Sequence, residues 1–200
     1  MIALQKEPVV WALGLCLLIA VPAFPADLID SVEGAYAARQ LRHTRFYPRT
    51  ASHEVSAEMR FLEDLFLLTD EVGLLNANVG LWFMTDGRRG IHAADYRDRM
   101  DLLRVRFAEL EAPERVRSVR DLLSESLVLQ QAFVNDWYTA LEAGKSFSSQ
   151  LTDENAYHEG LHRSHRIVLK VYAELHALFP EIGESSRRAF LDHLRGMDLK

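Results

Sequence analysis

Residues 61–82 read FLEDLFLLTDEVGLLNANVGLW, and the spacing of their apolar side chains decides the fold class. Seven large apolar residues recur in steps of four and three, the heptad pattern of a helix that buries one narrow stripe. These seven residues are Phe61, Leu65, Leu68, Val72, Leu75, Val79 and Trp82. One helix cannot remove such a stripe from water by itself, so the segment predicts packing against other helices.

The same spacing returns along the rest of the chain. Helical patterns cover about residues 92–111, 113–143 and 152–178, and a short helix follows that Ser185 or Ser186 would cap. No segment alternates apolar and polar residues as a half-buried strand does. We therefore predict an all-α fold, an antiparallel bundle of about four long helices with short flanking helices.

Two features of these apolar stripes leave alternatives open. Stripes on long helices also suit an extended coiled rod that dimerises along them, so a homodimer is an alternative architecture. Asn76 lies beside the stripe of residues 61–82. A polar residue at such a position either fixes the register between helices or faces solvent.

The first 26 residues differ from the remainder. Residues 9–21 are uncharged, and a run of roughly 13 residues matches the apolar part of a secretory signal peptide. It is shorter than the roughly 20 residues that a membrane-spanning helix needs. Cleavage is expected after Ala23 or Ala26, so residues 1–26 form the leader and 27–200 a single helical domain. The protein is then periplasmic or secreted, and a membrane anchor formed by residues 9–21 is the alternative.

Composition excludes several classes of protein. The 200 residues include 23 Lys plus Arg and 29 Asp plus Glu, for a formal net charge of −6. An acidic chain of this kind is not expected to bind nucleic acid over its surface. The one cysteine, Cys16, lies in the leader. The mature chain therefore has no cysteine for a disulfide or for nucleophilic catalysis.

A histidine-rich stretch carries the clearest chemical motif. Residues 158–162 are His158-Glu159-Gly160-Leu161-His162, which resembles the H-E-x-x-H zinc motif of the zincin metalloproteases. That resemblance implies that His158 and His162 bind zinc and that Glu159 activates a water molecule.

His165 lies on the same side of this expected helix and is a third candidate ligand for zinc or another transition metal. Two other interpretations stay open for the three histidines. They can form hydrogen bonds where helices meet, or they can act as a cluster that senses pH. In the first of these, Glu159 faces solvent and pairs with Arg163 one turn away.

A basic cluster lies near the end of the expected first helix, residues 27–45. Its members are Arg39, Arg42, Arg45 and Arg49. They can contact an anionic lipid or a cell-envelope polymer. Alternatively they are a solvated helix end whose charges interact favourably with the helix dipole.

No complete catalytic set accompanies these features. The chain contains no G-x-S-x-G motif and no Gly-rich phosphate loop. It also lacks the C-x-x-C-H motif of covalent haem attachment. We therefore expect an exported, non-catalytic binding or interaction module of the cell envelope, with a protein or small-ligand partner and no cofactor. The alternative is a metal-binding protein or a zincin-like metal-dependent hydrolase.

The leader hypothesis predicts the mature N-terminus. Mass spectrometry of the exported protein is expected to show a chain that begins at Phe24 or Asp27, because cleavage follows Ala23 or Ala26. A membrane-bound product that keeps residues 1–26 would instead support the anchor.

Overall fold

The computed structural model describes residues 56–85, 87–144 and 157–199. The leader, the expected first helix and the four arginines of the basic cluster lie outside the described residues. Within these ranges the chain forms five α-helices and one 3-10 turn, without a strand, which confirms the all-α class. The elements are α3 (Ala57–Met84), α4 (Ala93–Glu109), η1 (Glu114–Val116), α5 (Arg117–Glu142), α7 (Tyr157–Leu178) and α8 (Glu184–Met197).

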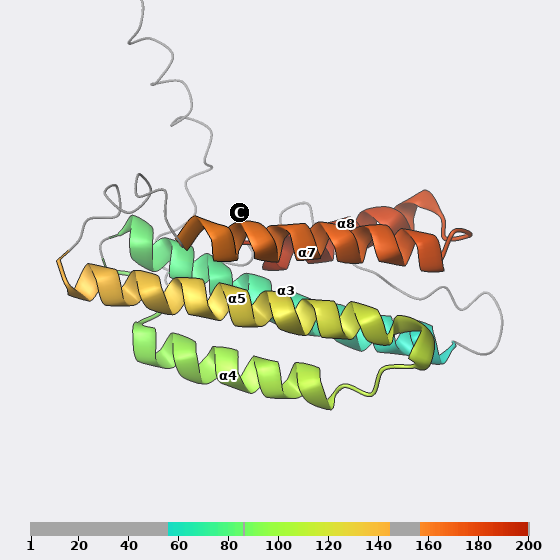
Figure 1. Ribbon diagram of the computed structural model, residues 1–200, viewed down its shortest axis with the longest axis horizontal. Helices are drawn as coiled ribbons and strands as arrows, with labels where there is room; N and C mark the ends of the chain where they lie inside the picture. The colour runs from blue at the N-terminus through green and yellow to red at the C-terminus, as the bar shows by residue number, and fades with distance from the viewer. Residues whose placement is uncertain (1–55, 86, 145–156, 200) are drawn as a thin grey trace, which may run out of the picture.

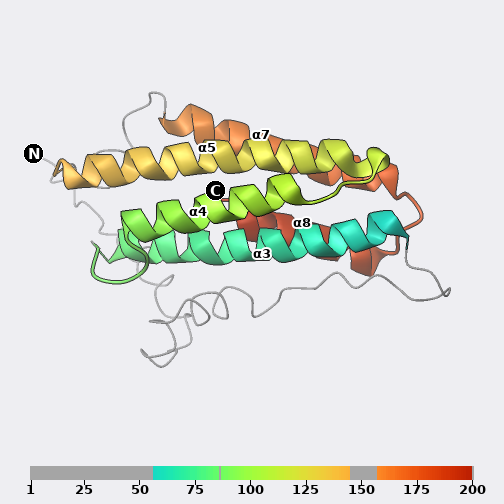
Figure 2. The same cartoon turned by 90° about the horizontal axis from the view of Figure 1, so that it is seen from below.

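The five helices pack side by side, and consecutive helices run in opposite directions (Figures 1 and 2). Helix α3 contacts α4 and α8, α5 contacts α4 and α7, and α7 contacts α8, so the contacts close a ring. The buried apolar residues of all five helices form one core cluster. The apolar stripes are thus covered within one chain, so the alternative of an extended rod is wrong, and a homodimer stays a prediction. None of the described helices is both long and apolar enough to cross a membrane.

Helix α3 begins and buries its stripe as its sequence predicts. Ser56 is the N-cap, and its hydroxyl accepts a hydrogen bond from the Met59 amide at 3.2 Å. Six of the seven stripe residues are buried, and Trp82 packs against the core while partly exposed.

The start of α8 differs from the expected caps. The helix begins at Glu184, and its N-cap is Gly183 rather than Ser185 or Ser186. The Gly183 carbonyl accepts hydrogen bonds from the amides of Ser186 and Arg187, at 3.0 and 3.2 Å. Both serines are therefore inside the first turn, where they cannot act as the N-cap.

A layer of hydrogen-bonded polar side chains crosses the apolar core. The Asn76 amide of α3 donates to Gln130 Oε1 of α5 at 2.9 Å and to the Met197 carbonyl of α8 at 2.7 Å. Gln130 Nε2 donates to the hydroxyls of Ser126 and Ser164, each at 3.2 Å. Those two hydroxyls lie 2.8 Å apart and join α5 to α7. We call these four side chains the polar layer.

Every member of the polar layer is at most 2% exposed. A buried polar group is costly unless it is hydrogen-bonded, so the helices must keep the register that pairs these groups. Asn76 therefore sets register, and the solvent-facing alternative for it is wrong. Its Oδ1 atom has no hydrogen-bond partner among the described residues.

Close backbone contact between α3 and α8 accompanies the polar layer. A Cβ atom added to Gly73 would lie 2.5 Å from the carbonyl oxygen of Gly196. That oxygen belongs to the backbone of α8 and cannot rotate away. Gly73 is therefore required by the close approach of the two helices rather than by any special backbone angle.

Two glycines of α3 provide a matched test of this contact. Gly73→Ala is expected to lower the free energy of unfolding by about 1–3 kcal/mol, because α8 must shift to admit the methyl group. Gly80→Ala is the control, since a Cβ there has no neighbouring atom within 4 Å. It should raise stability by about 0.5–1 kcal/mol through helix propensity. Urea unfolding followed by circular dichroism measures both changes, and equal effects at the two sites would contradict the packing.

Candidate functional site

The described histidines of α7 lie in different surroundings. His162 is exposed, whereas His165 is partly buried and its Nδ1 lies 2.5 Å from Asp198 Oδ2, just after α8. Asp198 itself is only 6% exposed. His165 therefore connects α7 to the C-terminal end of α8, as the helix-contact interpretation expects. His176 contacts the hydroxyl of Tyr172 at 3.1 Å on its own helix.

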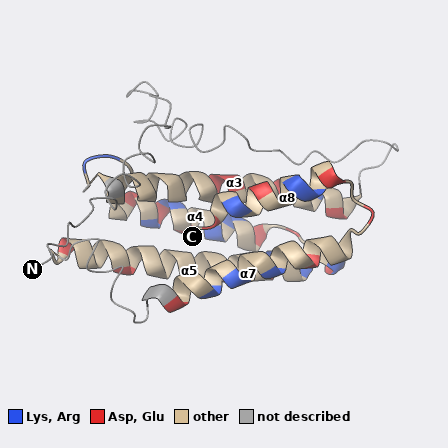
Figure 3. Ribbon diagram, turned by 90° about the horizontal axis from the view of Figure 1, so that it is seen from above, with Lys and Arg blue, Asp and Glu red and all other residues tan. Residues whose placement is uncertain are grey.

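Glu159 faces solvent but does not pair as expected. Its carboxylate lies 3.2 Å from Arg166, and its side chain is 74% exposed. Arg163 instead forms an ion pair with Glu125 of α5. The predicted Glu159–Arg163 pair is wrong because Arg163 lies beside α5, where a carboxylate is already within reach. Figure 3 shows residues of both charges along α7 and α8.

The described residues do not test the candidate metal site as a whole. In the described ranges, no group of three or more His, Cys, Asp or Glu residues is placed to hold a metal ion. The side chain of His158 lies outside what is described. A metal site formed by His158, His162 and His165 therefore stays a prediction.

A second histidine–carboxylate pair joins α8 to α3, and sequence reasoning missed it. His193 Nδ1 lies 2.8 Å from Asp70 Oδ1, and both side chains are largely buried. The His193 ring stacks on Phe66 with centroids 4.7 Å apart and planes 9° from parallel. The sequence signal that could have revealed this pair is the position of His193, which lies on the short apolar stripe of α8. Together the two pairs attach α8 to both of its neighbours.

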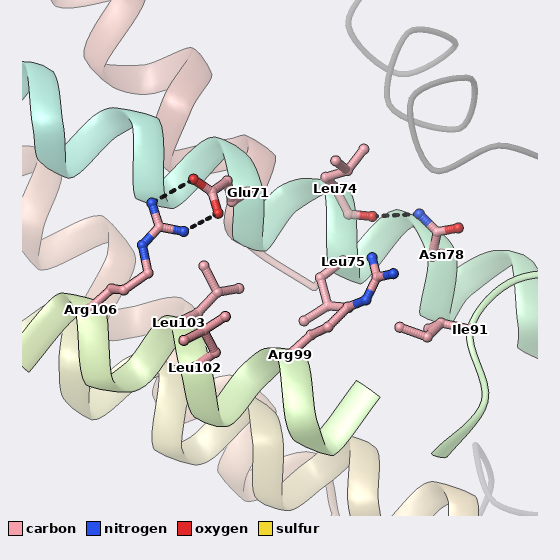
Figure 4. A pocket seen from close by; sticks show the side chains of 9 residues that line it. All are labelled: Glu71, Leu74, Leu75, Asn78, Ile91, Arg99, Leu102, Leu103 and Arg106. Atoms are coloured by element: carbon pink, nitrogen blue, oxygen red, sulfur yellow. Dashed lines mark hydrogen bonds and ion pairs between the residues drawn. The ribbon is translucent and has the colours of Figure 1, made fainter. Parts of the chain in front are cut away.

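A pocket of about 230 Å³ lies between α3 and α4 (Figure 4). Five of its nine lining residues are apolar, and the others are two arginines, a glutamate and an asparagine. The lining residues are Glu71, Leu74, Leu75, Asn78, Ile91, Arg99, Leu102, Leu103 and Arg106. Leu75, Ile91 and Leu103 are at most 7% exposed and belong to the core. The pocket therefore has an apolar floor continuous with the core of the molecule.

The charged groups at the pocket differ in their partners. Arg106 forms a two-point ion pair with Glu71, with Nη2 at 2.8 Å from Oε1 and Nη1 against Oε2. The hydrogen bonds to Glu71 raise the pKa of Arg106 above its usual range, so this guanidinium stays charged. Arg99 reaches from α4 toward α3 (Figure 4). No ion pair or hydrogen bond of Arg99 occurs within the described part of the chain.

The turn between α3 and α4 holds one end of the pocket in place. Gly90 has φ of 93°, and a Cβ there would lie 2.3 Å from the Asn78 carbonyl oxygen, so only glycine fits. The next residue, Ile91, donates its amide to that carbonyl at 3.4 Å. The Tyr138 hydroxyl of α5 donates to the Ile91 carbonyl at 2.6 Å. These contacts fix Ile91 in the pocket floor.

Exposed apolar side chains surround α4. Five large hydrophobic residues are described as exposed, and four of them lie on α3, α4 and α5. These four, which we call the α4 face, are Leu67, Leu102, Val105 and Val128, between 46% and 59% exposed. Two shallow hollows flank α4, one beside Leu67 and the other between Val105 and Val128. Sequence reasoning missed this surface, although Leu102 and Val105 lie off the buried stripe of their helix.

Comparisons with protein-family models, with curated proteins and with solved structures found no match to this chain.

Two buried tyrosines predict a loss of stability at alkaline pH. Burial raises the pKa values of Tyr96 and Tyr138 above their usual range. Both hydroxyls stay neutral in the folded chain, whereas unfolding lets them ionise near pH 10. The free energy of unfolding is therefore expected to fall as the pH rises above about 10, because the unfolded chain then binds fewer protons.

Replacing each tyrosine with phenylalanine separates the effect of its hydrogen bond on stability from the effect of its ionisation. Tyr138→Phe should cost about 1 kcal/mol at pH 7, because the bond to the Ile91 carbonyl is lost. The difference in free energy of unfolding between this variant and the parent protein should shrink above pH 10. Tyr96→Phe is the control, since the Tyr96 hydroxyl has no hydrogen-bond partner among the described residues. This substitution should leave the free energy of unfolding unchanged at pH 7. Urea unfolding at pH 7 and 10.5 tests both, and a deficit that stays constant with pH would contradict the argument.

Proposed function

We propose that this protein is an exported, non-catalytic binding module whose binding surface is the α4 face with its adjoining pocket. The observation that carries the proposal is that four of the five exposed large hydrophobic residues gather around α4. Scattered single apolar residues are normal on a protein surface, but a group of them marks a site of interaction.

The shape of this surface supports the proposal. Hollows on both sides of α4 and the pocket beneath Leu102 offer concave contacts for a partner. The pocket floor is rigid, because Gly90 and the bond from Tyr138 hold the turn at Ile91. A preformed surface loses little conformational freedom on binding, which favours affinity.

The described histidines and Glu159 lie elsewhere in the molecule. Glu159 pairs with Arg166, and His165 and His193 each contact a carboxylate on another element. They occur on α7 and α8, whereas the pocket is lined by α3, α4 and the turn between them. A catalytic role for these residues would therefore use a different part of the molecule from the α4 face.

The leader supports the location that we propose. Residues 1–26 would direct the chain to the periplasm or outside the cell, and an anchor formed by residues 9–21 would still leave the helical domain outside the inner membrane. The arginines at positions 39, 42, 45 and 49 would add a contact with an anionic envelope surface.

Photo-crosslinking from single positions tests the binding surface. A photoreactive residue replacing Val105 is expected to give a covalent adduct of defined mass in cells that export the protein, because Val105 is exposed on α4 and lines the hollow between α4 and α5. Intact-mass measurement detects a protein or a small-molecule adduct alike.

Lys170 provides the matched control, since it is an exposed position of α7 on another side of the bundle. The same probe at position 170 should give no adduct. Adducts of equal yield at the two positions, or none at position 105, would show that the α4 face is not the binding surface.

A further inference from the structure

We propose that the pocket between α3 and α4 binds a small monocarboxylate with a short apolar body, with its carboxylate on Arg99. This inference rests on the proposed function, because it assigns a ligand class to one part of the same surface. The geometry points to an apolar molecule with one anionic end.

The anionic end of the proposed ligand is inferred from the difference between Arg99 and Arg106. Arg106 is already paired with Glu71, which accepts a hydrogen bond from each of its two terminal nitrogens. Arg99 extends over the pocket and makes no ion pair or hydrogen bond within the described residues. A guanidinium matches the geometry of a carboxylate with two parallel hydrogen bonds. Arg99 is therefore the pocket's free anchor for an anion.

The apolar residues of the pocket floor indicate that the body of the ligand is apolar. Leu75, Ile91 and Leu103 present buried hydrocarbon surface, and Leu102 lies at the rim. Each methylene group that leaves water for such a surface contributes about 0.8 kcal/mol. An exposed ion pair contributes about 1 kcal/mol or less. Apolar contact therefore supplies most of the affinity, and Arg99 sets the orientation.

The volume limits the size of the ligand. A water molecule occupies about 30 Å³ of liquid, so 230 Å³ holds a body of about eight non-hydrogen atoms. Ligand pockets commonly run from about 300 to 1,000 Å³, so this one suits a small molecule. A six- to eight-carbon chain fills it.

The second end of the ligand must be uncharged. At the far end of the pocket from Arg99 lies the Glu71–Arg106 pair (Figure 4). A second carboxylate there would meet the Glu71 carboxylate, which already neutralises the charge of Arg106. A like charge in that position disfavours binding, so the pocket should reject a dicarboxylate of the same length.

A series of straight-chain carboxylates tests the proposal on the mature full-length protein. Calorimetry and amide chemical-shift mapping would follow the binding of butanoate, hexanoate, octanoate and decanoate. Affinity should rise about fourfold per methylene up to octanoate and then level off as the pocket fills. Shift changes should centre on Ile91 and Leu103. Octanedioate should bind at least about tenfold more weakly than octanoate.

Two arginines of α4 give a matched pair of variants. Arg99→Gln should weaken octanoate binding about two- to fivefold, the effect of one exposed ion pair. Octan-1-ol should bind the variant and the parent protein alike, because it has no carboxylate. Arg97→Gln is the control, since Arg97 donates to Asn135 of α5 at 3.2 Å and does not line the pocket. It should leave octanoate binding unchanged.

Several results would overturn the inference. They are affinity that does not depend on chain length, an equal loss in the two arginine variants, and shift changes centred away from Ile91 and Leu103. If no carboxylate binds while the probe at Val105 still captures a protein, the ligand class is wrong and the binding surface stands. If position 105 also gives no adduct, the proposed function fails as well.

Discussion

The polar layer is the constraint on which the rest of this structure depends. Four amide and hydroxyl side chains at the centre of an apolar core can be satisfied only when four helices stand in one register. A shift of one helix by a single turn moves its side chains by about 5.4 Å, which is enough to break every bond that this helix makes to the other helices in the layer. Apolar stripes alone would permit such a slip, because one leucine packs nearly as well as the next.

The placement of α8 follows from that register. The Asn76 amide bonds to the Met197 carbonyl, and the close contact of Gly73 with Gly196 lies beside it. With α8 held there, His193 reaches Asp70 on α3 and His165 reaches Asp198. His165 and His193 thus contribute contacts between helices. Each of them contacts a carboxylate on another element.

Helix α4 stands apart from this arrangement. It contributes no side chain to the polar layer, and its main contacts among the described α-helices are with α3 and α5. Its inner stripe, which includes Tyr96 and Phe107, is fully buried, while Leu102 and Val105 remain exposed on its outer side. A rigid core therefore supports a helix whose second apolar surface is uncovered. That combination suits a binding surface, because the scaffold stays ordered without the partner.

Local periodicity determined the all-α class and the stripes of the helices, because each depends on residues within a turn or two of one another. The leader and the basic cluster are also sequence predictions, and they concern residues outside those described. The tertiary structure alone decided that Asn76 is buried, that Arg163 pairs with Glu125 and that Gly183 caps α8. It also decided that Arg99 stands over a pocket. A sequence pattern states which side of a helix is buried. It does not state which distant residue lies opposite, because that depends on the register between helices far apart in the chain.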